Sequence, residues 1–123
     1  MSESSDKTKQ NRTELIVEAI REKKGKQIVI IDLSGVEKAI CDTFVICHGE
    51  STTQVGALAD WVEEKVKRES GERPHHIEGL QNSQWVLLDY FDCMVHIFLE
   101  EQRSFFNLEE LWADGKVKHL KDE

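Results

Sequence analysis

The fold of this chain is decided by residues 85–98, which read WVLLDYFDCMVHIF. Two runs rich in branched and aromatic residues, 84–89 and 92–99, flank Tyr90 and Phe91, and this pattern predicts two strands joined by a tight hairpin. With Tyr90 and Phe91 as the loop residues, the predicted cross-strand pairs are Asp89 with Asp92, Leu87 with Met94, and Trp85 with His96. This register decides which side chains share a face of the hairpin.

The two faces of the predicted hairpin differ in composition because side chains alternate along a strand. The first face is wholly apolar and is expected to be core; it carries Val86, Leu88, Cys93, Val95, Ile97 and Leu99. The second mixes aromatic rings, a histidine and acids; it carries Trp85, Leu87, Asp89, Asp92, Met94, His96 and Phe98. Such a mixture is typical of a surface that meets a partner, with aromatic anchors inside an acidic rim.

Two alternatives for the mixed face stay open: the register is different, or the face lies under a helix. In the predicted register Asp89 and Asp92 face each other, which is unfavourable unless a cation lies between them. A lysine or arginine of a partner protein would relieve that repulsion.

The rest of the chain predicts strands and helices around this hairpin. Helical periodicity appears over 13–24, over 51–70 and near 107–112, while 27–34 and 43–48 read as strands and 75–78 as a loop or short edge strand. This order predicts an α/β (α+β) fold with a single mixed β-sheet and flanking helices. We expect a disordered tail over 1–11, one domain over 12–114 and a frayed tail over 115–123.

Composition narrows the function classes. The chain has 123 residues and a formal net charge of −8, so it lacks the basic footprint of a protein that grips nucleic acid by its phosphates. Its acidity favours a basic protein partner or serves only solubility. Three widely spaced cysteines give no disulfide framework or metal knuckle and are expected to be buried, reduced thiols of a cytoplasmic protein. No membrane span and no targeting segment are evident.

Several motifs together resemble the Iojap-like ribosomal silencing factor family. They are Cys47-His48-Gly49 followed by Ser51-Thr52; Trp85-Val86-Leu87-Leu88-Asp89-Tyr90 with Asp92; Val95-His96-Ile97-Phe98; and Arg103, Leu108 and Leu111-Trp112. The resemblance runs from about Leu15 to Asp114. It departs from the family at Phe91, where a glycine is usual, at Phe106, where a tyrosine is usual, and at Cys93-Met94, which replace two valine-like residues.

The resemblance implies a nucleotidyltransferase-like fold and a non-enzymatic role. The implied action is to bind the large ribosomal subunit through its protein numbered fourteen and to block joining of the small subunit, which represses translation. A homodimer is implied for the free protein. For the contact surface we predict Trp85, Leu87, Asp89, Asp92, Met94 and His96, with Leu111 and Trp112 as a second patch. No cofactor, metal, membrane or sequence-specific nucleic acid is expected.

The alternative function is a nucleotide-binding or nucleotidyltransferase-like enzyme that uses Ser51, Asp89 and Asp92. Such transfer needs convergent carboxylates to hold Mg²⁺, and no Asp-x-Asp pair follows Ser51. Residues 51–54, Ser-Thr-Thr-Gln, form a capping box, so Ser51 is better explained as a helix cap than as a phosphate ligand.

Overall fold

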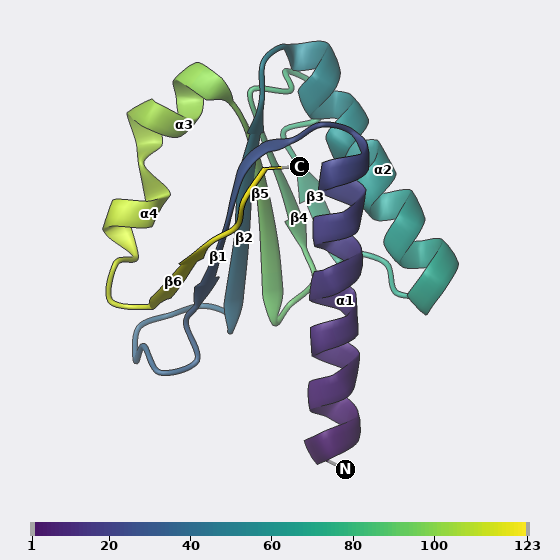
Figure 1. The fold of residues 1–123 in the computed structure, drawn as a ribbon, viewed down its shortest axis with the longest axis vertical. Helices are drawn as coiled ribbons and strands as arrows, with labels where there is room; N and C mark the ends of the chain where they lie inside the picture. Colours follow the sequence, from purple (N-terminus) through teal and green to yellow (C-terminus); the bar gives the residue numbers. More distant parts are fainter. Residues whose placement is uncertain (1, 123) are drawn as a thin grey trace.

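One six-stranded sheet organises the molecule in the computed structural model, which describes the backbone of residues 2–122 and the side chains of residues 12–122 (Figure 1). Its strands are β1 (Lys26–Asp32), β2 (Thr43–Gly49), β3 (His76–Glu78), β4 (Trp85–Asp89), β5 (Cys93–Leu99) and β6 (Lys116–His119), in the spatial order β3-β4-β5-β2-β1-β6. β2 and β5 run parallel and the other neighbouring pairs run antiparallel. The predicted α/β class with a single mixed sheet is confirmed.

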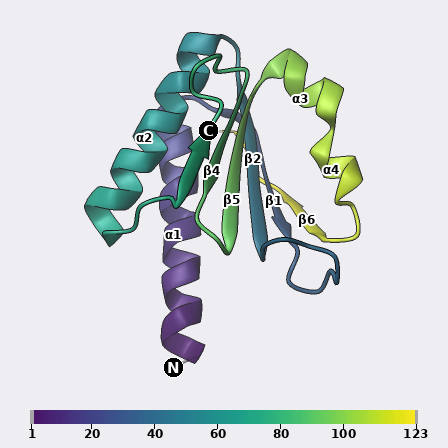
Figure 2. The same cartoon turned by 180° about the vertical axis from the view of Figure 1, so that it is seen from behind.

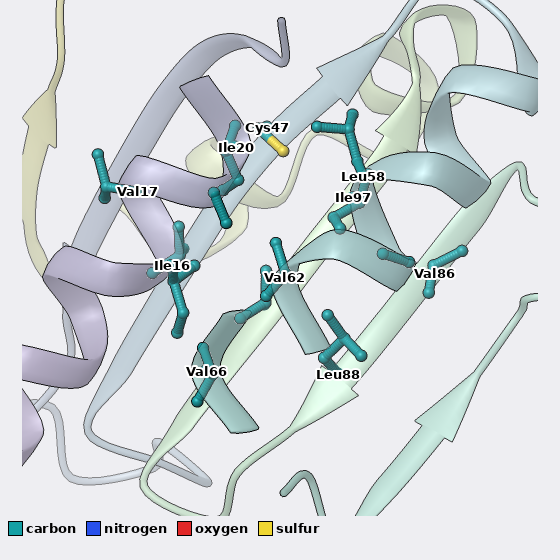
Figure 3. Packing of buried hydrophobic residues seen from close by; sticks show 14 of the residues in the cluster. Ile16, Val17, Ile20, Cys47, Leu58, Val62, Val66, Val86, Leu88 and Ile97 are labelled. Carbon is teal, nitrogen blue, oxygen red and sulfur yellow. The ribbon is translucent and has the colours of Figure 1, made fainter. Parts of the chain in front are cut away.

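Within residues 2–122, four helices cover the two faces of this sheet. α1 (Ser2–Glu22) and α2 (Thr52–Ser70) lie on one face, and α3 (Glu100–Phe106) and α4 (Leu108–Leu111) lie on the other (Figures 1 and 2). Figure 3 shows the larger core, in which Ile16 and Ile20 of α1 and Val62 of α2 meet the sheet. The apolar hairpin face predicted as core belongs to it, and Val86, Leu88, Cys93, Val95 and Ile97 are all buried.

The hairpin register differs from the predicted one by two residues. Asp89 lies opposite Met94 and Leu87 opposite His96, so the predicted pairing of Asp89 with Asp92 was wrong. The loop residues are Phe91 and Asp92, closed by a hydrogen bond from the Tyr90 N–H to the Cys93 carbonyl (2.8 Å). A shift of two residues leaves the side chains of β4 and β5 on their predicted faces because the side-chain period is two, whereas Asp92 falls in the turn.

Phe91 explains why the register was misplaced. It takes the left-handed conformation with φ of 74°, which a glycine adopts without strain and a phenylalanine does not. The Asp89 side chain accepts a hydrogen bond from the Phe91 N–H (2.8 Å), and the Phe91 ring lies 3.7 Å from the His75 ring. These contacts hold a turn that the residue type disfavours.

Both ends of the chain differ from expectation. α1 begins at Ser2, so the backbone of residues 2–11, predicted as a disordered tail, is helical; Met1 and the side chains of residues 1–11 lie outside the described residues. The segment predicted to be frayed contains β6, which pairs with β1 through Val117 opposite Ile31. All four β6 residues are exposed, so the strand has none of the apolar alternation that would reveal it in sequence.

The capping box at the start of α2 is confirmed. The Ser51 hydroxyl accepts from the Gln54 N–H (3.1 Å), and the Gln54 side-chain oxygen accepts from the Glu50 N–H (2.8 Å). The Gln54 amide also donates to the carbonyls of Lys23 and Lys24, which ties the helix start to the end of α1. Gly71 ends the helix in the left-handed conformation (φ 77°), directly after the range 51–70 that was predicted as helical.

Candidate functional site

Five of the predicted contact residues share the sheet face that carries α3 and α4. Trp85, Leu87 and Asp89 of β4 alternate with core residues, and their partners on β5 include Met94 and His96. Of these five, only His96 is fully buried; the other four are partly exposed. We call the partly exposed set Trp85, Leu87, Asp89 and Met94, together with Phe106, Leu111 and Trp112, the aromatic face.

Trp85 is fixed by His96. The indole N–H donates to Nδ1 of His96 (3.1 Å), so the hydrogen of the neutral imidazole sits on Nε2. Burial lowers the pKa of His96 to about 4, and the ring is therefore uncharged at neutral pH. Nε2 is buried and has no hydrogen-bond partner among the described residues. His96 thus acts as a positioning residue that orients the tryptophan ring.

A chain of ring contacts joins Trp85 to the second predicted patch. The Trp85 ring is stacked on Phe98 with centroids 4.9 Å apart, and Phe106 of α3 lies 4.6 Å from it. Phe44 lies 4.5 Å from His96 and 5.7 Å from Trp112. Trp85 and Trp112 are therefore linked through the buried rings of Phe44 and His96, on the sheet face that α3 and α4 partly cover.

The partly covered face answers one of the alternatives left open by the sequence. The face lies under helices at Phe98, which is fully buried, whereas Trp85, Leu87, Asp89 and Met94 stay partly exposed. Sequence reasoning missed Phe44, Phe105 and Phe106 as members or neighbours of this surface. The adjacent pair Phe105-Phe106 was the available signal, since two neighbouring residues of a short surface helix cannot both turn to the core.

β3 adds polar side chains to the same face. His76 lies opposite Asp89 and Glu78 opposite Leu87, and a hydrogen bond of 2.9 Å joins the His76 ring to the Glu78 carboxylate. The edge of the aromatic face near β3 is therefore rich in carboxylates, from Asp89 and Glu78. The partner surface expected from the sequence, with aromatic anchors inside an acidic rim, stays a prediction.

Asp92 does not belong to the aromatic face. It lies in the hairpin turn, and its carboxylate accepts a hydrogen bond from the buried guanidinium of Arg12 on α1 (2.6 Å), which also bonds to Glu72. Burial lowers the pKa of Arg12, but the bond to Glu72 and the nearby negative charges outweigh it and raise the pKa above its ordinary value. The Arg12 guanidinium also lies over the Tyr90 ring, 5.4 Å from its centroid.

The residues of the enzyme alternative do not converge. Ser51 follows β2 at the Gly49 end of the sheet, whereas Asp89 and Asp92 lie at the Thr43 end, a separation of about 20 Å from six strand residues. The Ser51 hydroxyl is engaged as a helix cap. Among the described side chains, no three His, Cys, Asp or Glu residues gather closely enough to hold a metal ion.

The three cysteines, Cys41, Cys47 and Cys93, are unpaired and buried as expected. Burial raises the pKa of Cys41 to about 11 and those of Cys47 and Cys93 to about 12, so all three are unreactive thiols at neutral pH.

Within residues 2–122, no helix has the length and apolar composition needed to cross a membrane.

Comparison with known proteins shows which family this chain resembles. The family model described as "Ribosomal silencing factor during starvation" matches residues 6–123. A ribosomal silencing factor of Halalkalibacterium halodurans is 39% identical over 111 residues, which cover 90% of this chain and 93% of that protein. A crystal structure of a Chromobacterium violaceum protein superposes with a TM-score of 0.79 and 31% identity, covering 92% of this chain and 93% of the other.

A more distant relative in mouse is named for mitochondrial assembly of the large ribosomal subunit. It is 28% identical over 102 residues, which cover 81% of this chain and 44% of that protein. The family model spans nearly all of the sequence, and the bacterial relative matches over nearly its full length. The chain belongs to the family of ribosomal silencing factors.

Proposed function

We propose that this protein binds the large ribosomal subunit through its protein numbered fourteen and sterically prevents the small subunit from joining. The family assignment supports a ribosome-directed role. The observation that carries the docking proposal is the aromatic face, where His96 holds the ring of Trp85, which remains partly exposed, and where Leu111 is 70% exposed. A rigid aromatic anchor loses little conformational entropy on binding, which is a common feature of interface hot spots.

Charge supports the same partner chemistry. Ribosomal proteins are commonly basic, whereas this chain carries a net charge of −8. Glu78 and Asp89 add carboxylates beside the anchors, at the edge of the aromatic face formed by β3 and β4. Opposite charges on the two surfaces would speed encounter and fix orientation, while apolar contacts supply most of the affinity. The proposed site is the cytoplasm, where assembled subunits meet.

Binding alone accounts for the silencing in this proposal. A domain of 123 residues seated on the subunit interface would occupy volume that the small subunit needs, so no catalytic step is required. The free protein would hide its aromatic face in a homodimer, because large exposed apolar patches are rare on monomeric proteins.

The test is a binding and joining experiment with the full chain. Purified large subunits, small subunits and assembled ribosomes are sedimented with the protein, and subunit joining is then followed by light scattering. We expect cosedimentation with free large subunits only, and a loss of joining that follows occupancy. Binding to small subunits alone, or binding to large subunits with undiminished joining, would contradict the proposal.

We also propose that the protein is not a nucleotide-dependent enzyme, since Ser51, Asp89 and Asp92 do not meet. Titration calorimetry with Mg²⁺ and ATP, CTP, GTP or UTP should show no micromolar binding. Tight binding of any of these that is lost in Ser51→Ala would support the enzyme alternative instead.

A further inference from the structure

A cavity of about 510 Å³ lies between α3, β1, β2 and the chain that follows β6. None of the predicted contact residues lines it. Its volume falls within the range of small-molecule sites, roughly 300–1,000 Å³. Its lining mixes the apolar residues Ile28, Val29 and Leu120 with polar ones, of which His48 is 3% exposed and Arg103 is 9% exposed.

The cavity lies where the chain paths diverge from two parallel strands. β2 and β5 end side by side, with Gly49 opposite Leu99. After β2 the chain enters α2 on one face of the sheet, and after β5 it enters α3 on the other face (Figures 1 and 2). In α/β sheets, ligands bind in the crevice beyond the carboxyl ends of strands at such a divergence.

Hydrogen bonds fix the protonation of the cavity wall. Arg103 donates through Nε to Glu109 (2.9 Å) and through Nη1 to Nδ1 of His48 (3.0 Å) and to the carbonyl of Lys26 (3.3 Å). Because Nδ1 of His48 accepts, the imidazole hydrogen lies on Nε2, which is 3.5 Å from the Glu100 carboxylate. Burial and the Arg103 charge lower the pKa of His48, so its ring is neutral.

The charges of the lining do not cancel. The guanidinium of Arg103 is matched by Glu109, and His48 is neutral. Among the described residues of the lining, the remaining basic group is the exposed imidazole of His119, so the two carboxylates of Glu100 and Asp122 face at most one further cation. Asp122 accepts a hydrogen bond from the Gln27 N–H (2.9 Å), which fixes its position at the cavity. An anionic ligand would meet repulsion here, whereas a cation would gain charge-assisted hydrogen bonds.

We propose that this cavity binds a small organic cation that carries a primary ammonium or guanidinium group. Glu100 and Asp122 accept hydrogen bonds from that group. The buried pair of Arg103 and His48 forms the rigid floor of the cavity. The site is separate from the docking proposal, so either can fail without the other.

Calorimetry on the full chain tests the site with putrescine, spermidine and agmatine as probes and Mg²⁺-ATP and glutamate as anionic controls. We expect saturable one-to-one binding of at least one amine below about 1 mM, and none of the anions. The imidazole signals of His48 should shift on amine binding. Glu100→Gln and Asp122→Asn should each weaken binding about tenfold, because each removes one charged acceptor.

Glu64→Gln, on the exposed side of α2, is the matched control and should bind as the unaltered protein does. Both test residues are exposed, so circular dichroism is expected to show native folding in each variant. The proposal is overturned if no amine saturates by about 10 mM, if the anions bind instead, or if neither test substitution changes the affinity.

Discussion

Trp85 is the residue on which the docking proposal rests most heavily. Trp85→Ala should weaken binding to large subunits by about 2 kcal/mol or more, the usual scale of a hot spot. Leu111→Asp should also weaken binding, and because Leu111 is 70% exposed, it should leave the stability of the fold nearly unchanged. Cosedimentation at several protein concentrations gives both affinities.

Glu64→Ala on the exposed side of α2 is the control for this pair and should bind normally. Trp85 also packs on Phe98, so the folding of Trp85→Ala must be checked by denaturant unfolding. Undiminished binding by both folded Trp85→Ala and Leu111→Asp would show that the aromatic face is not the docking surface.

Asp92 has a structural role that the sequence did not reveal. Asp92→Asn keeps the size of the side chain but removes the charge that bonds to the buried guanidinium of Arg12. The free energy of unfolding should fall by about 1.5–3 kcal/mol, the range for a hydrogen bond to a charged group. Urea unfolding measures this change, and large-subunit binding by the folded fraction should be unaltered. If Asp92→Asn had normal stability but bound large subunits more weakly, Asp92 would be a contact residue after all.

His96 gives the fold a predictable pH dependence. Its pKa is about 4 in the folded protein and about 6.5 when unfolded, so the unfolded chain binds more protons between these values. Stability should therefore decrease as pH falls from about 6.5 to 4, by about 3 kcal/mol from this residue. His96→Phe should show a flatter stability profile than the unaltered protein over that window. Urea unfolding at each pH gives both profiles. If the free energies of unfolding of His96→Phe and of the unaltered protein changed in parallel with pH, His96 would not be buried in the neutral form.

At the scale of elements, the start of α2 offers a test of the cap against the phosphate-site interpretation. Ser51→Ala removes the acceptor for the Gln54 N–H and should lower the free energy of unfolding by about 1 kcal/mol. Ser51→Asp, which can also cap, should retain most of the stability. Thermal unfolding of the unaltered protein, Ser51→Ala and Ser51→Asp measures these differences in stability. Equal stability of Ser51→Ala and the unaltered protein would count against a capping role for Ser51.

For the hairpin of β4 and β5, the sequence predicted the two faces but not the register. Alternation along 85–98 correctly separated the core face from the mixed face, because a two-residue slip preserves both faces. The register itself depended on whether Phe91 would accept a positive φ, and the contacts with Asp89 and His75 that stabilise it come from the tertiary structure. Asp92 was misplaced for the same reason, since its partner Arg12 is 80 residues away.

The ends of the sheet were harder to predict than its centre. β1, β2, β4 and β5 are apolar enough to be recognised as strands, whereas β6 has only exposed residues and is stabilised by pairing with β1. The candidate site was likewise predictable only in part. The sequence pattern identified Trp85, Leu87, Met94 and Leu111 as candidate contact residues. It did not identify Phe44, which lies near them only because β2 pairs with β5.

At the scale of the whole molecule, the aromatic face has consequences for self-association. Leu111 and Phe106 of this face are 70% and 42% exposed, and the neighbouring Phe105 is 79% exposed. Together they leave an apolar area that a second copy would cover. We expect the free protein to form a homodimer whose population rises with concentration. Leu111→Asp should shift it toward monomer, because two carboxylates would be brought into one apolar interface.

The dimer and the ribosome should compete if both use this face. Sedimentation velocity at rising concentration measures the dimer constant, and adding large subunits to a preformed dimer should release one bound monomer for each subunit occupied. Leu111→Asp would then weaken both associations, whereas Glu64→Ala would weaken neither. A strict monomer at about 100 µM would contradict the self-association proposal, since an apolar interface of standard size normally holds two chains together well below that concentration. A dimer that binds the large subunit intact would place the two associations on different surfaces, and Leu111→Asp would then separate them by disrupting only one.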